Sequence, residues 1–518
     1  MCGILSIFSN ERIKTSCEYL KSRGPENCNI LYTDNASHIF YRLAINDTIS
    51  KEANQPFTSN DNSIVMMCNG EIYNFKRLEQ EHELKCKSNS DCEPIMYLYK
   101  KFGFVETVKK LYGVYAIMLV DKDIVYLARD RIGVRPLYFG LTFTGTFVVS
   151  SLPQSILDIC TSVQEFPPGM TAMFELNSLE KNKLLRCLSI DNIRLPMTRI
   201  SNNPYKEIQN CLFKSVSMRL VSDRPIGCLL SGGLDSSIIA SVLTKLGVRD
   251  LKTFSIGMEG SPDLICARKV SEYLKTEHTE VQFSPEEGIE AIEEVIKNLA
   301  SYDITTIRAS IPMYLLCRYI SKYTDVKVVF SGEGSDELFG GYLYFHNAPS
   351  KEDFENETIN LLNNLHNYDV LRADRCISNN GLEPRVPFLD KDFVDMIVSL
   401  PVNEKIPVNG IEKFALRKAF EGFLPQEILL RRKEAFSDGV SQQNKSWYQY
   451  LQEYINDKIS DNIFNSTKYP SKEAMYYRLI FEKHFPTYNF NIPYWLPKWS
   501  NETKEPSART LDIYKQQV

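Results

Sequence analysis

The chain has 518 residues, of which 43% are apolar and 24% are charged, and its formal net charge at pH 7 is -5. This length exceeds one ordinary hydrophobic core and predicts at least two domains, with a composition typical of a soluble globular enzyme. The negative charge argues against nucleic acid as the main partner, so any phosphate site must be local.

The thirteen cysteines include no Cys-x-x-Cys pair, which favours reduced thiols over a disulfide framework or a zinc site. No stretch approaches the ~20 apolar residues of a membrane span, and the apolar run at residues 4–8 is too short for a signal peptide. We therefore expect a cytoplasmic protein with no membrane partner and no structural metal.

Cys2 directly follows the initiator methionine, and its small side chain is compatible with removal of Met1. The thiol and a free α-amine would then belong to one residue. An α-amine with a pKa of about 7.7 to 8.0 is partly neutral near pH 7 and can take the thiol proton. A lone cysteine at position 2 is a weak signal, so its meaning depends on the motifs that follow.

Six short motifs occur in order along the N-terminal part of the chain. They are Met-Cys-Gly-Ile at 1–4, Ser-Arg-Gly-Pro at 22–25, Tyr-Arg-Leu-Ala at 41–44, Cys-Asn-Gly-Glu-Ile-Tyr-Asn at 68–74, Ser-Asp-Cys-Glu at 90–93 and Asp-Arg-Ile-Gly-Val-Arg-Pro-Leu at 130–137. Together they resemble the class II glutamine amidotransferases, whose glutaminase domain is an N-terminal-nucleophile αββα sandwich. Apolar runs at 63–68, 115–120 and 124–128 fit the strands of that fold.

The resemblance implies a nucleophile and a glutamine site in this half. Cys2 would be the nucleophile, and Asn69 and Gly70 would donate to the oxyanion of the tetrahedral intermediate. Free glutamine carries both charges, so it needs a fixed cation and a fixed anion. By the resemblance these are Arg42 and Asp91, with Asn69, Gly70 and Glu71 as further glutamine-binding residues.

Each motif also has a plain structural reading. Asn-Gly alone is more often a hairpin turn, and Asp-Arg-x-Gly can be a turn with a surface ion pair. Two residues depart from the family pattern, Glu26 after Arg-Gly-Pro and Pro94 after Glu93. Pro94 is tolerable if Asp91 caps a helix, because the first turn does not need its N–H. We expect neither departure to abolish activity.

Residues 166–204 are less regular, with a short strand pair near 171–175 and then an exposed connection. We place a glutaminase domain at 2–185, a linker at 186–204 and a second domain at 205–518.

The stretch Leu-Leu-Ser-Gly-Gly-Leu-Asp-Ser-Ser at 229–237 organises the second half. It ends a buried strand and opens a helix with an apolar stripe that Gly247 stops. Such a turn aims backbone N–H groups and the positive end of the helix dipole at one spot, which suits phosphate. The spacing is not that of a Walker P-loop. It resembles the pyrophosphate loop of the ATP pyrophosphatases, with Asp235 beside the phosphates as a ligand for Mg²⁺.

Further strands at 251–258 and 326–330 alternate with helices, which predicts a doubly wound parallel sheet with the nucleotide at its carboxyl edge. The second of these strands ends in Ser-Gly-Glu-Gly-Ser-Asp-Glu at 331–337. Bare acids there would repel ATP, so they need Mg²⁺ or a proton-transfer role.

The string Tyr-Asp-Ile-Thr-Thr-Ile-Arg-Ala-Ser at 302–310 places two hydroxyls and an arginine just before a helix, with Pro312 expected in its first turn. As structure alone, Thr305 and Thr306 would be helix caps. The asparagine synthetases hold aspartate with a string of this kind. Motifs at 381–390 and 431–439 resemble the same family, as does Tyr-Trp-Leu-Pro-Lys-Trp at 494–499, which is like the eukaryotic form.

The chain is thus identified as a member of the glutamine-hydrolysing asparagine synthetases, from Met1 to about Leu511. The resemblance implies the substrates ATP, L-aspartate and L-glutamine, with Mg²⁺ as cofactor, and a homodimer. Glu333 would accept the proton of attacking ammonia, with a metal-binding or capping acid as the alternative. The other implied residues bind ATP, aspartate or the metal. For ATP they are Leu230, Ser231, Gly232, Gly233, Asp235, Ser236, Ile256, Ser331, Gly332 and Lys433; for aspartate, Thr305, Thr306 and Arg308; and for the metal, Asp235 and Asp336.

Two rival functions remain at this point. One is an amidotransferase with another acyl acceptor, which would not need the aspartate-binding residues of the Thr-Thr-x-Arg string. The other is a non-catalytic regulatory paralogue, which would be free to lose Cys2, Asp235, Glu333 or Lys433.

Overall fold

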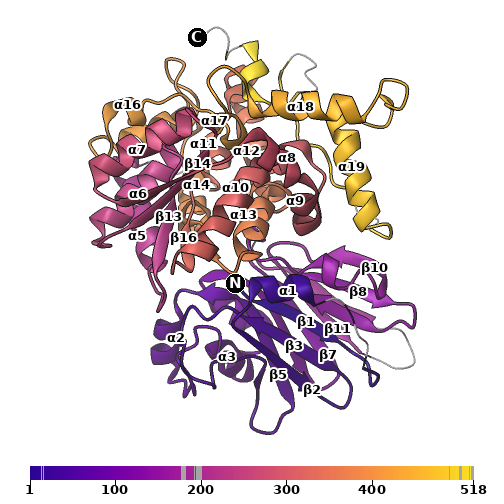
Figure 1. Cartoon of the computed structure of the whole chain (residues 1–518). Helices are drawn as coiled ribbons and strands as arrows, with labels where there is room; N and C mark the ends of the chain where they lie inside the picture. The colour runs from indigo at the N-terminus through magenta and orange to yellow at the C-terminus, as the bar shows by residue number, and fades with distance from the viewer. Residues whose placement is uncertain are drawn as a thin grey trace.

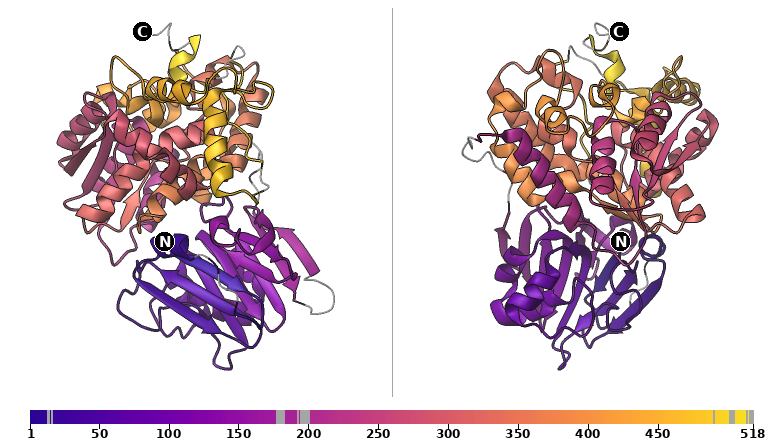
Figure 2. Two further views of the ribbon diagram at one scale, coloured as in Figure 1. Left: turned by 45° about the vertical axis from the view of Figure 1, so that its right-hand side comes forward. Right: turned by 90° about the vertical axis from the view of Figure 1, so that its left-hand side faces the viewer.

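The computed structural model spans the chain, and the structure describes every residue except 13–14, 16, 177–182, 192, 194–200, 489–490, 501–504, 513 and 515–518. Two domains follow one another (Figure 1), a β-rich one in indigo and purple and a mixed helical and β one above it. The N-terminus lies at their junction in all three views (Figures 1 and 2), and Met1 is buried there.

The first domain contains two six-stranded antiparallel sheets, with the orders β10-β8-β9-β1-β3-β2 and β12-β11-β7-β6-β5-β4. Their strands are β1 (Gly3–Ile7), β2 (Asn27–Tyr32), β3 (Ser37–Arg42), β4 (Phe57–Thr58), β5 (Ile64–Ile72), β6 (Gly113–Asp121), β7 (Ile124–Arg129), β8 (Tyr138–Thr142), β9 (Phe147–Ser150), β10 (Cys160–Glu165), β11 (Met170–Glu175) and β12 (Lys183–Ser189).

The domain has four layers, with two sheets between two layers of helix. Side chains alternate along each strand, so neighbouring residues face different layers. Ile4 of β1 and Val65 of β5 point into one core between the sheets, while their neighbours Leu5 and Met66 face outward. Helix α1 (Glu18–Arg23) covers the outer face of the first sheet; α2 (Phe75–His82), α3 (Pro94–Phe102) and α4 (Phe104–Lys110) cover that of the second. The expected αββα sandwich is therefore confirmed.

One plain structural alternative for the motifs in this domain is wrong, and another holds in part. Asn69 and Gly70 lie inside β5 rather than in a hairpin turn. Residues 130–133 do form a turn, closed by the Gly133 N–H on the Asp130 carbonyl oxygen at 3.0 Å, and Arg131 pairs with Asp395 at 2.6 Å. The Asp130 carboxylate is buried and accepts the N–H groups of Val134 and Arg135 at 2.9 Å each, so it organises the loop that follows. Strand β12 pairs with β11 as far as Ser189, so the sheet continues past residue 185.

The second domain is built on a parallel sheet of order β15-β14-β13-β16-β17. These strands are β13 (Ile226–Leu229), β14 (Lys252–Gly257), β15 (Glu277–Gln282), β16 (Val328–Phe330) and β17 (Glu383–Arg385). The chain moves outward from β13 on one side and then crosses to β16 on the other. The loops that follow β13 and β16 are therefore neighbours at the point where parallel sheets bind ligands.

Helices pack against both faces of this sheet, as the doubly wound prediction requires, and further helices of the domain pack on those helices. They are α5 (Pro204–Met218), α6 (Leu234–Lys245), α7 (Pro262–Leu274), α8 (Pro285–Glu290), α9 (Ile292–Leu299), α10 (Ile304–Tyr323), α11 (Ser335–Phe339), α12 (Lys351–Asn364), α13 (Asp369–Ser378), α14 (Lys391–Ser399), α15 (Phe414–Ala419), α16 (Gln426–Leu429), α17 (Phe436–Gly439), α18 (Trp447–Lys458) and α19 (Lys472–His484).

Two apolar cores flank the sheet. Cys228 of β13 and Val328 of β16 point toward α5, α6 and α14, while the next residues, Leu229 and Val329, point toward α9, α10 and α13. All thirteen cysteines are unpaired thiols. Among the described residues, no helix combines the length and the apolar content that a membrane span requires.

Candidate active sites

Two pockets collect the residues that the sequence singled out. The Cys2 pocket is lined by Cys2, Arg42, Asn69, Gly70, Glu71 and Asp91. The carboxyl-edge pocket is lined by Leu230, Ser231, Gly233, Asp235, Ser236, Ile256, Thr305, Thr306, Arg308, Ser331, Gly332, Glu333, Asp336 and Lys433. Gly232 is not among the residues that line this pocket. It packs against α7, where a Cβ at this position would lie 2.4 Å from the backbone nitrogen of Ala267.

Cys2 precedes β1 and faces the middle of β5. Its backbone nitrogen donates to Asn69 Oδ1 at 3.1 Å, and its Sγ lies 3.8 Å from the carbonyl oxygen of Leu43. Burial raises the pKa of the thiol, so the thiol needs a nearby base to react. The Nδ2 group of Asn69 is buried and has no hydrogen-bond partner within the described part of the chain. An unpartnered donor beside the predicted nucleophile is suited to an oxyanion.

Gly70 is required next to Asn69 for a steric reason. A Cβ at this position would meet the carbonyl oxygen of Val114 on β6 at 2.5 Å. Only glycine lets β5 and β6 stay paired here, which keeps Asn69 aimed at Cys2.

Arg42 and Asp91 supply opposite charges in this pocket. The guanidinium of Arg42 donates to Asn54 Oδ1 at 2.8 Å and to the carbonyl oxygens of Asn46 and Asp47, and within the described residues it forms no ion pair. The Asp91 carboxylate accepts the N–H of Ile72 at 2.8 Å, and burial raises its pKa. Both charged groups are therefore fixed by hydrogen bonds, and neither neutralises the other.

The prediction that Asp91 caps a helix is wrong. Helix α3 begins at Pro94 with Glu93 at the N-cap position, while Asp91 turns into the pocket toward the N–H of Ile72. Pro94 does stand in the first turn, where its missing N–H costs nothing.

Glu26, which departs from the family pattern, connects the two domains through its carboxylate. Its carboxylate accepts the N–H of Ala44 at 2.7 Å and pairs with Arg224, which precedes β13, at 2.8 Å.

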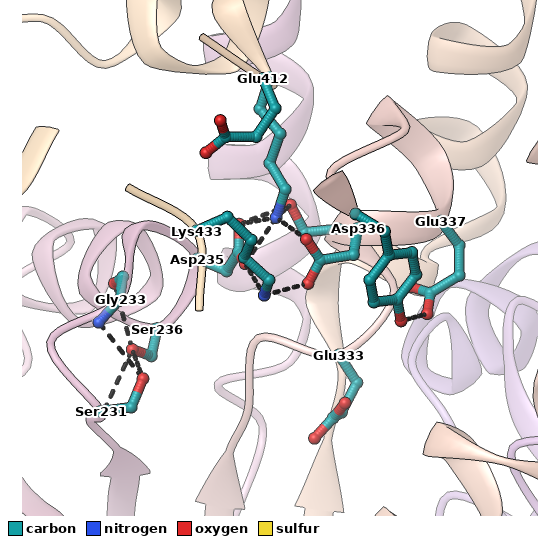
Figure 3. Close-up of polar contacts among 12 residues, drawn as sticks. Ser231, Gly233, Asp235, Ser236, Glu333, Asp336, Glu337, Glu412 and Lys433 are labelled. Atoms are coloured by element: carbon teal, nitrogen blue, oxygen red, sulfur yellow. Dashed lines mark hydrogen bonds and ion pairs between the residues drawn. The ribbon is translucent and has the colours of Figure 1, made fainter. Parts of the chain in front are cut away.

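The loop after β13 forms one wall of the carboxyl-edge pocket (Figure 3). The Oγ atoms of Ser231 and Ser236 lie 3.1 Å apart, and the N–H of Gly233 donates to Ser231 Oγ at 3.3 Å. These contacts fold the loop over the start of α6, so hydroxyls and N–H groups share the N-terminal end of the helix.

Asp235 and Asp336 face each other across this pocket, and two lysines bind them. Lys413 Nζ lies 2.7 Å from Asp235 Oδ2 and 2.6 Å from Asp336 Oδ1, and Lys433 Nζ lies 2.5 Å from Asp336 Oδ2. Burial raises the pKa of Asp336, but the two ammonium groups outweigh it and bring the pKa to about 2. The sequence analysis did not predict Lys413, because this residue belongs to no recognisable motif. It lies just before α15.

These two carboxylates fit a cation whose other ligands come from a nucleotide. Among the described residues, no group of three or more His, Cys, Asp or Glu side chains is arranged to hold a metal ion. Mg²⁺ is commonly held by one or two carboxylates together with substrate phosphates. The ammonium groups that bind both carboxylates here show that this spot accepts positive charge.

Glu333 lies on the loop after β16 and is held by Arg372 of α13. Arg372 Nη2 donates to Glu333 Oε2 at 2.7 Å, and the same guanidinium pairs with Asp369. Burial raises the pKa of Glu333, while the charge of Arg372 opposes that rise. No motif pointed to Arg372, which stands 39 residues from its partner.

The reading of residues 302–310 needs correction. Helix α10 begins at Ile304, and the carboxylate of Asp303 caps it by accepting the N–H of Thr306 at 2.9 Å. Neither Thr305 nor Thr306 is the cap, and Pro312 lies inside the helix rather than in its first turn. The Oγ1 atom of Thr305 is buried and has no partner within the described residues.

Pro312 helps to position Arg308. Since proline has no N–H, it leaves the carbonyl oxygen four residues earlier without its helical donor. That oxygen belongs to Arg308 and accepts the Nε1–H of Trp447 at 3.2 Å. The Arg308 side chain is engaged as well, by carboxylates of Glu473 and Glu505.

Comparisons with known proteins match two family models to separate parts of the chain. The family model for the glutamine amidotransferase domain matches residues 1–195, and that for asparagine synthase matches residues 207–363 and 349–500. The proteins called asparagine synthetase [glutamine-hydrolyzing] of Gallus gallus and Homo sapiens are each 43% identical, over 562 and 566 residues, covering 100% of both chains.

Solved structures give more distant likenesses. The allosteric regulatory enzyme of purine biosynthesis is 16% identical with a TM-score of 0.32, covering 54% of this chain and 80% of its own. The NH3-dependent NAD synthetase from Campylobacter jejuni is 17% identical with a TM-score of 0.20, covering 43% and 98%.

Proposed function

This chain belongs to the family of glutamine-hydrolysing asparagine synthetases, and from that membership and its two pockets we propose the chemistry of each site. As a carbon–nitrogen ligase with glutamine as amido donor, it converts ATP, L-aspartate, L-glutamine and water into AMP, diphosphate, L-asparagine and L-glutamate. The observation that carries the assignment is that all the predicted site residues except Gly232 line one of two pockets in this chain.

The Cys2 pocket releases ammonia from glutamine. Arg42 binds the α-carboxylate of glutamine, and Asp91 with Glu71 binds its α-ammonium. After removal of Met1, the α-amine of Cys2 takes the thiol proton and the thiolate attacks the side-chain amide carbon. Asn69 Nδ2 and the Gly70 N–H stabilise the oxyanion, ammonia leaves, and water hydrolyses the thioester. The contact between the Cys2 nitrogen and Asn69 supports this arrangement, because it fixes where the freed amine would lie.

The carboxyl-edge pocket activates aspartate. The loop Ser231, Gly232, Gly233, Asp235 and Ser236 binds the pyrophosphate of ATP, and Lys413 and Lys433 supply counter-charge, while Leu230 and Ile256 border the adenosine. The β-carboxylate of aspartate attacks the α-phosphate, giving β-aspartyl-AMP and diphosphate. Asp235 and Asp336 are the residues that would hold Mg²⁺, which supplies charge neutralisation when it is bound with ATP.

Glu333 acts in the second step of this pocket. Ammonia attacks the acyl carbon of β-aspartyl-AMP to give a cationic adduct, which must lose a proton before AMP leaves. A carboxylate within hydrogen-bond reach can stabilise that cation and accept the proton. The contact with Arg372 supports this role, because the guanidinium charge favours the ionised form of Glu333 and opposes the rise in pKa that burial causes.

Ammonia passes between the pockets inside the protein, because water would protonate it and hydrolyse the acyl adenylate. The geometry supports a short internal route. Glu383 lines the Cys2 pocket and begins β17, which pairs with β16, the strand whose loop carries Glu333.

We further propose a cytoplasmic homodimer. Thirteen unpaired thiols favour a reducing compartment, and the dimer rests on family resemblance. The predicted boundary at residue 185 falls inside β12, so we extend the first domain to Ser189 and keep the start of the second domain at residue 205.

One assay tests the assignment. The protein is incubated with ATP, Mg²⁺, aspartate and glutamine, and asparagine, AMP and diphosphate are measured together. We expect the three products in equal amounts and dependent on aspartate. Release of ADP and phosphate instead, or asparagine formation without diphosphate, would contradict the adenylate route.

A further inference from the structure

Both hydrogen-bonding edges of the Arg308 guanidinium are filled by carboxylates of the protein itself. Its Nε and Nη2 donate to Glu473 at 2.8 and 2.6 Å. Its Nη2 donates to Glu505 Oε2 at 3.0 Å, and Nη1 makes a second contact with the same carboxylate. A guanidinium offers two such forks, so no bidentate position is left for the carboxylate of a substrate.

The two carboxylates are held differently. Glu473 stands in the first turn of α19 and is 2% exposed, whereas the Glu505 side chain is 21% exposed and belongs to no helix or strand. Glu505 is steadied by Gln452 Nε2 at 2.7 Å and by the N–H of Ser507 at 3.0 Å. Of the two partners, Glu505 is therefore the replaceable one.

The residues after Glu505 form part of the pocket wall. Ser507 Oγ donates to Asp438 Oδ1 at 2.7 Å, and Arg509 Nη2 donates to the Asp438 carbonyl oxygen at 2.9 Å. Pro506, Ser507, Ala508 and Leu511 line the carboxyl-edge pocket. Glu505 thus directly precedes a segment of the pocket wall that is held to Asp438 of α17.

Charge decides whether Glu505 and a substrate carboxylate can be present together. Arg308, Glu473 and Glu505 already sum to one negative charge at a site that is largely buried. A third carboxylate would place three anions around one cation in a medium that screens them poorly. A substrate carboxylate can enter only in exchange for one already there.

We propose that Glu505 is an internal competitor of aspartate, filling the Nη1 and Nη2 edge of Arg308 in the empty site and leaving when a carboxylate of aspartate arrives. This inference rests on the proposed function, since it takes Arg308 as an aspartate-binding residue. It makes Glu505 a specificity-determining residue, because only a ligand with its own carboxylate restores the partner that Arg308 loses.

The test is a steady-state comparison of Glu505→Gln with the parental enzyme. Glutamine keeps the length of the side chain but lacks the charge, so aspartate meets a weaker competitor. We expect the KM for aspartate to fall about two- to five-fold, the range for a partly exposed ion pair. The KM values for ATP and glutamine should not move. Glu482→Gln is the control, since Glu482 makes a comparable 2.7 Å pair with Arg478 outside the pocket.

A second variant covers the case in which the first does not fold well. Glu505→Ala leaves room for a free carboxylate, so added propionate should raise the apparent KM for aspartate in this variant and not in the parental enzyme. An aspartate KM that is unchanged or raised in Glu505→Gln, or propionate without effect on Glu505→Ala, would overturn the proposal. Failure of the proposed function is distinct, because the parental enzyme itself would then make no asparagine.

Discussion

Replacing Arg372 by glutamine should disfavour the ionised form of Glu333 while leaving the side chain in place. The two side chains are 9% and 12% exposed and lie 2.7 Å apart. Removing one partner of a buried ion pair costs about 3–5 kcal/mol. Arg372 divides its charge between Glu333 and Asp369. We therefore assign roughly half of that range, about 2 kcal/mol, to stabilising ionised Glu333.

The sign of the pH effect follows from the proposed role of Glu333 as a base. Burial raises the pKa of this carboxyl group and Arg372 opposes the rise, so the variant should lose its base at a higher pH than the parental enzyme. Where the protonated form dominates, a loss of about 2 kcal/mol reduces the ionised fraction about 30-fold. Asparagine formation should fall by that factor at the acid end and converge with the parental rate at the alkaline end.

The assay measures asparagine and diphosphate in the same tube across pH, with the ammonium concentration adjusted to keep free ammonia constant. Diphosphate release should continue, because adenylation does not use Glu333. Arg372→Lys is the matched control, since it keeps the cation and should restore most of the parental profile. The reasoning would be refuted if the rate of asparagine formation fell at the same acid pH as in the parental enzyme, or if asparagine and diphosphate fell in equal proportion.

Three further outcomes are expected. Cys2→Ala should lose glutamine-dependent synthesis and keep ammonia-dependent synthesis; loss of both in a folded variant contradicts two separate sites. Asp235→Asn should abolish asparagine formation with either nitrogen source while glutaminase activity remains; a parental rate would make Asp235 a turn residue only. Lys413→Met should lower the free energy of unfolding by about 3 kcal/mol, the low end for a buried pair, because Lys433 still faces Asp336. Added Mg²⁺ should restore part of this loss in urea unfolding, and unchanged stability would exclude Lys413 as the counter-charge.

The sequence was sufficient to predict features that depend on local pattern. The turn at Gly232 and Gly233 joins a short apolar strand to an amphipathic helix, and both elements are recognisable from spacing alone. The same holds for the acid-rich loop after β16. Because parallel strands place their carboxyl ends at one edge, these two loops were bound to meet once the sheet was known to be parallel.

Residues that act through distant partners were not predictable in this way. Lys413 and Arg372 lie in stretches without a motif, and only the folded chain brings them to Asp235 and Glu333. The wrong predictions of helix N-caps have a related cause. Asp91 and Asp303 are both acids near a helix start, but the N–H of Ile72 on another element draws Asp91 away. Asp303 accepts the N–H of Trp495 on Oδ1 at 2.7 Å and still caps α10 through Oδ2.

The junction between the domains combines apolar packing with buried ion pairs, and the ion pairs restrict how the two pockets are aligned. Arg23 of the first domain binds Asp374 of the second through two hydrogen bonds of 2.7 and 2.9 Å, and both side chains are buried. Arg385 similarly bridges Glu383 and Glu71. Buried pairs contribute little net stability, but a small displacement leaves charge uncompensated, so they tolerate one geometry where apolar surfaces would tolerate several. An internal path for ammonia needs that single geometry, because its two ends lie on different domains.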